Sequence, residues 1–267
     1  MASALLSDLR EIGREQVEYR ALLYQMTKRD LLLRYKQTIM GFGWAVFMPL
    51  VNTVVFSVIF TRVAPINPGV AYPVFAYCGL LAWNFSASSL RFAVNSLTGN
   101  TNLVTKVYFP REIFPFSVVI VSLVDFAVGA LVLVAMMVYY RVAVTPALVF
   151  LPVVILIHLT LTTGLALFLA MANLFYRDVK YLFEIVITVW MFATSVLYPI
   201  DMIGGRLGGV LRMNPMTPII DGYRSVLLHG TLPEPGFFSI AAVLSFLTLG
   251  FGWLAFHRAE FKFAENV

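Results

Sequence analysis

The sequence predicts an all-α membrane protein with about six transmembrane helices. Of its 267 residues, 60% are hydrophobic and only 12% are charged, whereas a soluble domain is roughly 45–50% apolar and about 25% charged. From Gly41 onward the apolar residues form long runs, each near the roughly 20 residues that cross a bilayer core of about 30 Å. Because these runs are continuous rather than alternating, they indicate helices instead of the strands of a membrane barrel.

The segment 1–40 is polar and basic, and we expect it to lie on the cytoplasmic side with an amphipathic interface helix over 15–36. Tyr19, Leu22, Leu23 and Met26 recur at helical spacing and would form the apolar face of that helix. The alternative is a solvated helix on the cytoplasmic face. Four basic residues are candidates for contact with a substrate head group, or with anionic lipid: Arg14, Arg20, Lys28 and Arg29. We find no cleavable signal peptide in this segment.

The remainder, 41–267, is predicted to be one transmembrane domain. Its spans are expected at about 41–63, 71–97, 113–139, 147–172, 180–200 and 237–256. Between the last two spans, the segment from Asp201 to Pro235 is rich in glycine and proline and holds several charged side chains. That segment is too polar to cross the membrane, and short helices that re-enter the outer face would fit it.

The distribution of lysine and arginine predicts the orientation. Thirteen of these residues fall on the side of the N-terminus, five fall on the opposite side, and Arg91 lies within the second span. Cytoplasmic loops carry the excess of positive charge, so both termini are expected in the cytoplasm. The net charge of +5 is then explained by anionic lipid and does not require a nucleic-acid partner.

The loop from Asn100 to Pro115 predicts a short amphipathic helix on the cytoplasmic side. Asn100 is a favourable N-cap residue, and Pro110 would stop the helix. The helix either packs on its own spans and lipid head groups, or docks a soluble partner. The residues expected to dock are Leu103, Val104, Val107 and Tyr108 on the apolar face, with Lys106 and Arg111 at the rim.

Polar residues within the second span predict one face that turns away from lipid. Asn84, Ser88, Arg91 and Asn95 follow one another at steps of four, three and four residues, which places them on one side of a helix. Such a stripe serves either hydrogen bonding between helices or the wall of an aqueous conduit.

Two tryptophans, Trp83 and Trp190, lie near the centres of spans, although tryptophan usually sits at the membrane interface. They either pack in the core or stack on sugar rings along the conduit.

The sequence offers few other candidate functional residues. Asp125 and His158 are expected near mid-membrane, where they would pair with each other, or Asp125 with Arg91; a proton relay is the alternative. Cys78 is the only cysteine, so an intrachain disulfide and a cysteine metal cluster are excluded. We expect no catalytic residue and no metal site in this chain.

Several motifs, taken in chain order, resemble those of ABC-2 type polysaccharide export permeases, in particular the exporters of O-antigen or teichoic acid. Arg34-Tyr35-Lys36-Gln37-Thr38, with Gly41 and Trp44, is similar to the start of that family. The loop from Asn102 to Arg111, followed by Pro115, is similar to its coupling helix, and Asn173 to Asp178 resembles its loop between spans four and five. The outer re-entrant region is matched by Tyr198-Pro199, Asn214-Pro215, Pro218 and Tyr223-Arg224.

The resemblance implies a homodimeric permease in the cytoplasmic (inner) membrane of a bacterium, with two separate ATP-binding cassette subunits that hold ATP and Mg. Its substrate would be a lipid-linked polysaccharide, expected to be O-antigen, with teichoic acid or capsule as alternatives. The sequence agrees in lacking GxxxxGK[ST], since its nearest approach, Gly99 to Lys106, has Val104 in place of the second glycine. Two alternatives are an ABC-2 exporter of a small molecule or lipid, and an ion-coupled transporter, for which we find no internal repeat.

Overall fold

The computed structural model describes residues 18–36, 40–41, 43–106 and 109–263, and within these ranges the secondary structure is helical, with no strand. The all-α class is therefore confirmed. The helices are α2 (Arg20–Tyr35), α3 (Gly43–Val58), α4 (Tyr72–Val94), α5 (Thr101–Lys106), α6 (Ile113–Tyr139), α7 (Leu151–Phe175), α8 (Val179–Phe192), α9 (Gly205–Met213), α10 (Met216–Arg224) and α11 (Pro235–Ala259).

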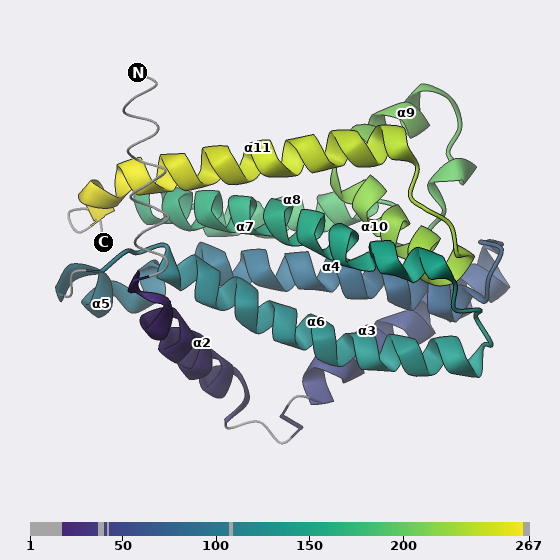
Figure 1. Cartoon of the computed structure of the whole chain (residues 1–267), viewed down its shortest axis with the longest axis horizontal. Coiled ribbons are helices and arrows are strands. Elements are labelled where there is room, and N and C mark those ends of the chain that lie inside the picture. Colours follow the sequence, from purple (N-terminus) through teal and green to yellow (C-terminus); the bar gives the residue numbers. More distant parts are fainter. Residues whose placement is uncertain (1–17, 37–39, 42, 107–108, 264–267) are drawn as a thin grey trace.

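Long helices lie alongside one another in a single bundle (Figure 1). Four helical segments of the described chain are long and apolar enough to cross a membrane: Gly43–Val63, Ile113–Tyr139, Pro146–Phe175 and Pro235–Lys262. The first of these joins α3 to the π-helical turn Ile59–Val63. These four segments correspond to the predicted spans at 41–63, 113–139, 147–172 and 237–256.

The other two predicted spans form helices of a different kind. Helix α4 has 23 residues, enough to cross a bilayer, but most of them are buried within the protein. Helix α8 has only 14 residues, about 21 Å at 1.5 Å per residue, so the span predicted at 180–200 is wrong in its second half, because the helix ends at Phe192.

Side chains from the following segment explain why α8 can end early. The Asn214 Nδ2 atom donates to the carbonyl oxygen of Ala193 at 3.2 Å. The Arg224 guanidinium donates to the carbonyl oxygens of Ser195 and Val196. A helix end leaves carbonyl groups without intrahelical partners, and buried groups of this kind require another donor. Asn214 and Arg224 supply these donors, so the backbone leaves the helix within the bundle.

Helix α4 is the centre of the bundle. It packs against α3, α6, α7, α8 and α10, and its residues contribute much of the main hydrophobic cluster. Helix α7 packs most extensively against α11. The polar stripe of the second span therefore lies on a largely enclosed helix and not on one that faces lipid all round.

The two ends of the bundle carry different short elements (Figure 1). One end, which we call the α5 end, holds α5 and the last turns of α11. A second hydrophobic cluster lies there and includes Val104, Phe114 and Phe256. The opposite end, the α10 end, holds α9 and α10, which come from the glycine- and proline-rich segment. Helix α10 is wedged against α4, α7 and α11, and all but one of its residues are buried.

Helix α2 lies against α6 and covers Arg20–Tyr35 of the interface helix predicted over 15–36, while residues 15–17 lie outside the described residues. Met26 is buried, and Tyr19, Leu22 and Leu23 pack against the hydrophobic cluster at the α5 end. The predicted apolar face is thus present, and it is covered at least in part by the protein's own helices.

Candidate transport and coupling sites

The polar stripe of α4 opens onto a cavity. Asn84, Ser88 and Arg91 line a space of about 370 Å³ together with Asn52 of α3 and Asp125 of α6. The Asn84 and Ser88 side chains are partly exposed, whereas their α4 neighbours Phe85 and Ser89 are buried. The structure therefore brings three of the predicted conduit residues together beside one cavity, while their role in transport remains a prediction.

The two central tryptophans do not share that cavity. Trp83 is 3% exposed and meets Trp190 edge to face, with ring centroids 5.5 Å apart. The Trp190 Nε1 atom donates to the Asn214 Oδ1 atom at 3.0 Å. Trp83 therefore has no open face in this chain, contrary to the conduit-lining prediction, because α8 covers it. Its environment matches core packing.

Asp125 is engaged by the interface helix and not by the residues expected from the sequence. Arg34 of α2 forms an ion pair with the Asp125 carboxylate, and the Tyr35 hydroxyl donates to its other oxygen. The Arg34 guanidinium also lies over the Phe92 ring, 3.9 Å from its centroid. One turn earlier in α2, the Asp30 carboxylate accepts a hydrogen bond from the Ser117 hydroxyl of α6 at 2.7 Å. Helix α2 is thus fixed to α6 at two polar points.

The predicted partners of Asp125 are occupied elsewhere, so those pairings were wrong. Arg91 forms an ion pair with Glu184 of α8 at 3.1 Å, in which both side chains are about half exposed. His158 is fully buried and hydrogen-bonds Ser86 at 2.7 Å and Tyr223 at 3.2 Å. His158 and Asp125 therefore bond to different partners, so these contacts give a proton relay between the two no support.

The predicted docking helix forms, but part of its expected surface faces inward. Val104 is fully buried in the cluster at the α5 end, whereas Leu103 is half-buried and Lys106 is exposed. Val107 and Tyr108 lie outside the described residues. The assignment of Val104 to a partner-binding surface is therefore wrong, because its side chain already packs against the protein's own spans. Leu103 and Lys106 remain candidates.

Arg111 was also expected at a docking rim, and instead it joins two parts of the chain. Its backbone N–H donates to Glu260 at 2.8 Å, and its guanidinium reaches the same carboxylate and the Val104 carbonyl. Its neighbour Glu112 is buried and contacts His257 of α11 at 3.3 Å. The coupling loop is therefore tied to the end of α11.

Glu112, His257 and Glu260 offer three ligand atoms within 4.8 Å of one another, which is a grouping that a metal ion can use. The Glu260 carboxylate, however, already accepts the two donors from Arg111. A positive guanidinium at that position opposes a cation, so the donor set fits an ion cluster better than a metal site. The expectation of no metal stays a prediction.

The basic residues of the interface helix lie in different environments. Arg20 and Lys28 are exposed, as contact with head groups would require. Arg29 instead pairs with Asp30 at 2.7 Å. Arg14 lies outside the described residues. The structure thus leaves Arg20 and Lys28 as the accessible members of the predicted set.

Residues of the predicted outer region converge at the α10 end. Arg224 is 2% exposed, lies over the Phe75 ring at 3.6 Å from its centroid, and pairs with Asp221 at 3.3 Å. Tyr223 is buried and Tyr198 is half-buried, its hydroxyl donating to the Phe192 carbonyl at 2.9 Å. Three of the four residues expected to mark this region, Tyr198, Asn214 and Arg224, therefore stabilise the turn after α8. The fourth, Tyr223, instead contacts His158 of α7 and the Phe126 ring of α6.

Gly79 is a member of this site that the sequence did not reveal. A Cβ atom on Gly79 would lie 2.4 Å from the Arg224 Nη2 atom and 2.4 Å from the Val196 carbonyl oxygen. The glycine thus makes room for the buried guanidinium. Its only sequence signal was its place in an otherwise continuous helix, and its partner is 145 residues away along the chain.

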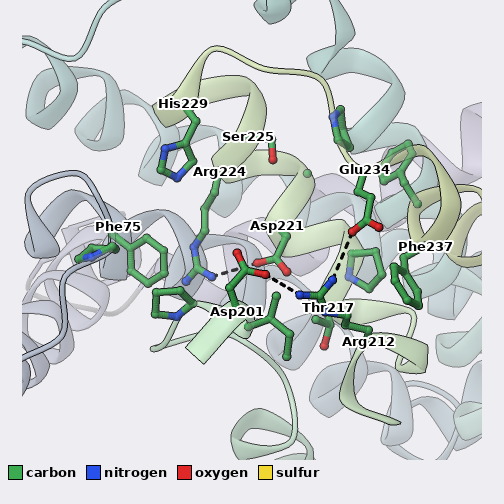
Figure 2. Close-up of a pocket in the computed structure, with 17 residues that line it drawn as sticks. Phe75, Asp201, Arg212, Thr217, Asp221, Arg224, Ser225, His229, Glu234 and Phe237 are labelled. Atoms are coloured by element: carbon green, nitrogen blue, oxygen red, sulfur yellow. Dashed lines mark hydrogen bonds and ion pairs between the residues drawn. The ribbon is translucent and has the colours of Figure 1, made fainter. Parts of the chain in front are cut away.

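Beside Arg224 lies a pocket of about 310 Å³, shown in Figure 2. At its rim, Arg212 forms ion pairs with Asp201 and Glu234 and faces the Phe237 ring. Burial raises the pKa of Asp221, against the opposing effect of Arg224. Burial also lowers the pKa of His229, as does the neighbouring Arg224 charge. We call this space the outer pocket, after the outer segment that the sequence predicts.

These features define a membrane protein with a polar cavity along a central helix, a short helix exposed at one end, and wedged helices at the other. The model of the ABC-2 type transporter family matches residues 21–228, which is most of the chain. The protein therefore belongs to the ABC-2 type transporter family.

Three relatives carry the same description. An O-antigen export system permease protein of Myxococcus xanthus is 31% identical over 257 residues, which cover 95% of this chain and 98% of the relative. Two proteins from Klebsiella pneumoniae with that description are 28% and 29% identical, each over 248 residues, covering 91% of this chain and 94% of the relative.

Proposed function

We propose that this chain is the membrane-spanning permease subunit of an ATP-driven exporter that moves lipid-linked polysaccharide, specifically O-antigen, across the cytoplasmic membrane. The observation that carries the proposal is the 31% identity, over nearly the full length of both chains, with an O-antigen export permease. Similarity that extends from end to end covers the interface helix, the coupling loop and the outer segment together, and not the spans alone.

The structure supports a division of labour between the two ends. The α5 end faces the cytoplasm, and both termini lie on that side. There, the exposed Lys106 and the half-buried Leu103 contact one of two ATP-binding cassette subunits. These partner subunits hold ATP and Mg. Because Arg111 and Glu112 join the loop to Glu260 and His257, movement of the loop is transmitted directly to α11. The segment with α9 and α10 re-enters the outer face.

Two copies of the chain enclose the conduit. The cavity beside Asn84 and Ser88 supplies polar contacts that a passing polysaccharide needs, and Arg20 and Lys28 attract the phosphates of the lipid carrier. An exporter of a small molecule or lipid, or an ion-coupled transporter, is the alternative function.

Deletion of the gene from its own strain tests this proposal. The deletion strain is expected to lose O-antigen from its surface and to accumulate the lipid-linked polymer inside, with both defects restored by the intact gene. Surface lipopolysaccharide is compared by gel electrophoresis and by antibody labelling of whole cells. Normal surface O-antigen in the deletion strain would overturn the assignment.

The purified chain is expected to hydrolyse no ATP by itself, because its sequence has no phosphate-binding GxxxxGK[ST] loop. The measurement is phosphate release by the reconstituted chain, before and after addition of the candidate cassette subunit. A control sample in which the cassette subunit lacks its own phosphate-binding lysine identifies contaminating ATPases. Hydrolysis by the permease alone, at a rate the contaminants do not explain, would contradict the prediction.

Cysteine substitution tests the conduit. In a Cys78→Ala background, Ser88→Cys is expected to react with a small water-soluble thiol reagent, because Ser88 lines the α4 cavity. Ser89→Cys is the matched control, since Ser89 is its chain neighbour and is fully buried. Reactivity is followed by mass spectrometry with and without nucleotide-bound cassette subunits. Equal reactivity at both positions in every state would identify the stripe as a packing seam.

A further inference from the structure

The lining of the outer pocket combines apolar and polar side chains. Phe237 and Phe238 give it apolar surfaces, while Thr217, Asp221 and Arg224 supply polar ones. Figure 2 shows the labelled members of this set, all but Phe238, around one space, with Arg212 bridging Asp201 and Glu234 at its rim. Its volume of about 310 Å³ lies at the lower end of the roughly 300–1,000 Å³ typical of ligand sites.

Two polar atoms in the pocket lining lack a partner within the protein. The Thr217 hydroxyl is fully buried, and neither it nor the Arg224 Nε atom has a hydrogen-bond partner among the described residues. Buried polar groups are almost always satisfied, because an unmade hydrogen bond costs about 1–3 kcal/mol. The other two guanidinium nitrogens of Arg224 have partners: Nη1 donates to the Ser195 carbonyl and to Asp221, and Nη2 donates to the Val196 carbonyl. A ligand with hydroxyl groups would complete the set.

The charge of the pocket selects among ligands. Three carboxylates (Asp201, Asp221 and Glu234) face two guanidinium groups (Arg212 and Arg224). The lowered pKa of His229 keeps its imidazole neutral. With every carboxylate ionised, the formal charge of the lining is therefore −1. The pocket thus has no excess positive charge to hold a phosphate or pyrophosphate, and it suits a neutral ligand whose hydroxyl groups donate to carboxylates.

We propose that the outer pocket binds a neutral sugar residue of the exported polysaccharide as it leaves the permease. A sugar ring presents hydroxyl groups at its edge and an apolar face, and the pocket offers carboxylates for the first and the Phe237 ring for the second. This inference rests on the proposed function, since it assigns a substrate site to the same transporter. The lipid pyrophosphate is not a ligand of this pocket.

The test is a direct binding measurement on the full chain in lipid nanodiscs. The probe is an oligosaccharide of the strain's own O-polysaccharide, released from its lipid by mild acid, and saturation-transfer NMR gives its affinity. Phe237→Ala is expected to weaken binding about tenfold. Thr217→Val is expected to weaken it about threefold while leaving thermal stability unchanged or raised, because the variant removes an unpartnered hydroxyl and preserves shape.

Phe251→Ala is the matched control, because Phe251 is an exposed phenylalanine of α11 that does not line the pocket. This variant should bind the oligosaccharide with the same affinity as the unaltered chain. Unchanged affinity in both pocket variants would overturn the proposal, as would competition by sodium pyrophosphate. If the oligosaccharide does not bind while the intact strain exports O-antigen, the pocket assignment fails and the transport function stands. If the deletion strain still displays O-antigen, the transport function itself fails.

Discussion

Replacement of Arg224 by methionine is expected to lower the free energy of unfolding by about 3–5 kcal/mol, the range measured when one partner of a buried ion pair is removed. The Arg224 side chain is 3% exposed. Its removal leaves the carbonyl groups of Ser195 and Val196 without their donor and leaves Asp221 without its cation. The turn that follows α8 depends on these donors, so the packing of α10 should be lost with it.

Thermal unfolding of the purified chain in detergent, monitored by circular dichroism, measures this effect. Arg212→Met is the matched control, because Arg212 lies in the same outer segment but pairs with exposed carboxylates, where ion pairs contribute about 0–1 kcal/mol. Gly79→Val should reproduce the Arg224 defect, since its side chain would occupy the space of the guanidinium. A midpoint for Arg224→Met equal to that of Arg212→Met would refute this account of the turn.

Asp125→Ala is expected to reduce export at least tenfold while the chain still inserts and binds its cassette subunits. Asp125 is the acceptor for both Arg34 and Tyr35, so its loss frees the last turn of α2 from α6. Charged residues within a transmembrane helix are expensive to bury and need a partner, and Arg34 would be left facing Phe92 alone. The Ser117–Asp30 bond would hold only the middle of α2.

Export is measured as the amount of surface O-antigen per folded complex. Spin labels on α2 and α6 report the position of the interface helix. Glu184→Ala is the matched control, because it breaks the exposed pair with Arg91 and should change export little. Asp125→Asn should be milder than Asp125→Ala, since an amide oxygen still accepts hydrogen bonds. Normal export by Asp125→Ala, or an unmoved α2, would show that the contact is dispensable.

Much of this architecture was predictable from the sequence because a bilayer imposes a length on each apolar helix. The spans at 41–63, 113–139 and 237–256 agree closely with the observed helices. The interface helix and the coupling helix were predicted from apolar spacing, which is a local signal. The segment after α8 was recognised by its glycines, prolines and charges.

What was missed depends on contacts between distant residues. The early end of α8 follows from donors at Asn214 and Arg224, which apolar content does not report. The partner of Asp125 lies 91 residues away at Arg34, and nothing in either local pattern selects it. Val104 was assigned to an open surface because its own helix predicted an apolar face. Trp83 was considered for the conduit because tryptophan is unusual near the centre of a span. Only the packing of other helices decides whether either side chain is covered.

Reconstitution of the complex tests the central claim most directly. The permease and its cassette subunits are placed in proteoliposomes with fluorescently labelled lipid-linked O-antigen on the side of the α5 end, and its appearance on the opposite side is measured. The account predicts translocation that requires hydrolysable ATP and stops when the cassette phosphate-binding lysine is replaced. Translocation by the permease alone, driven by a proton or sodium gradient without ATP, would contradict it.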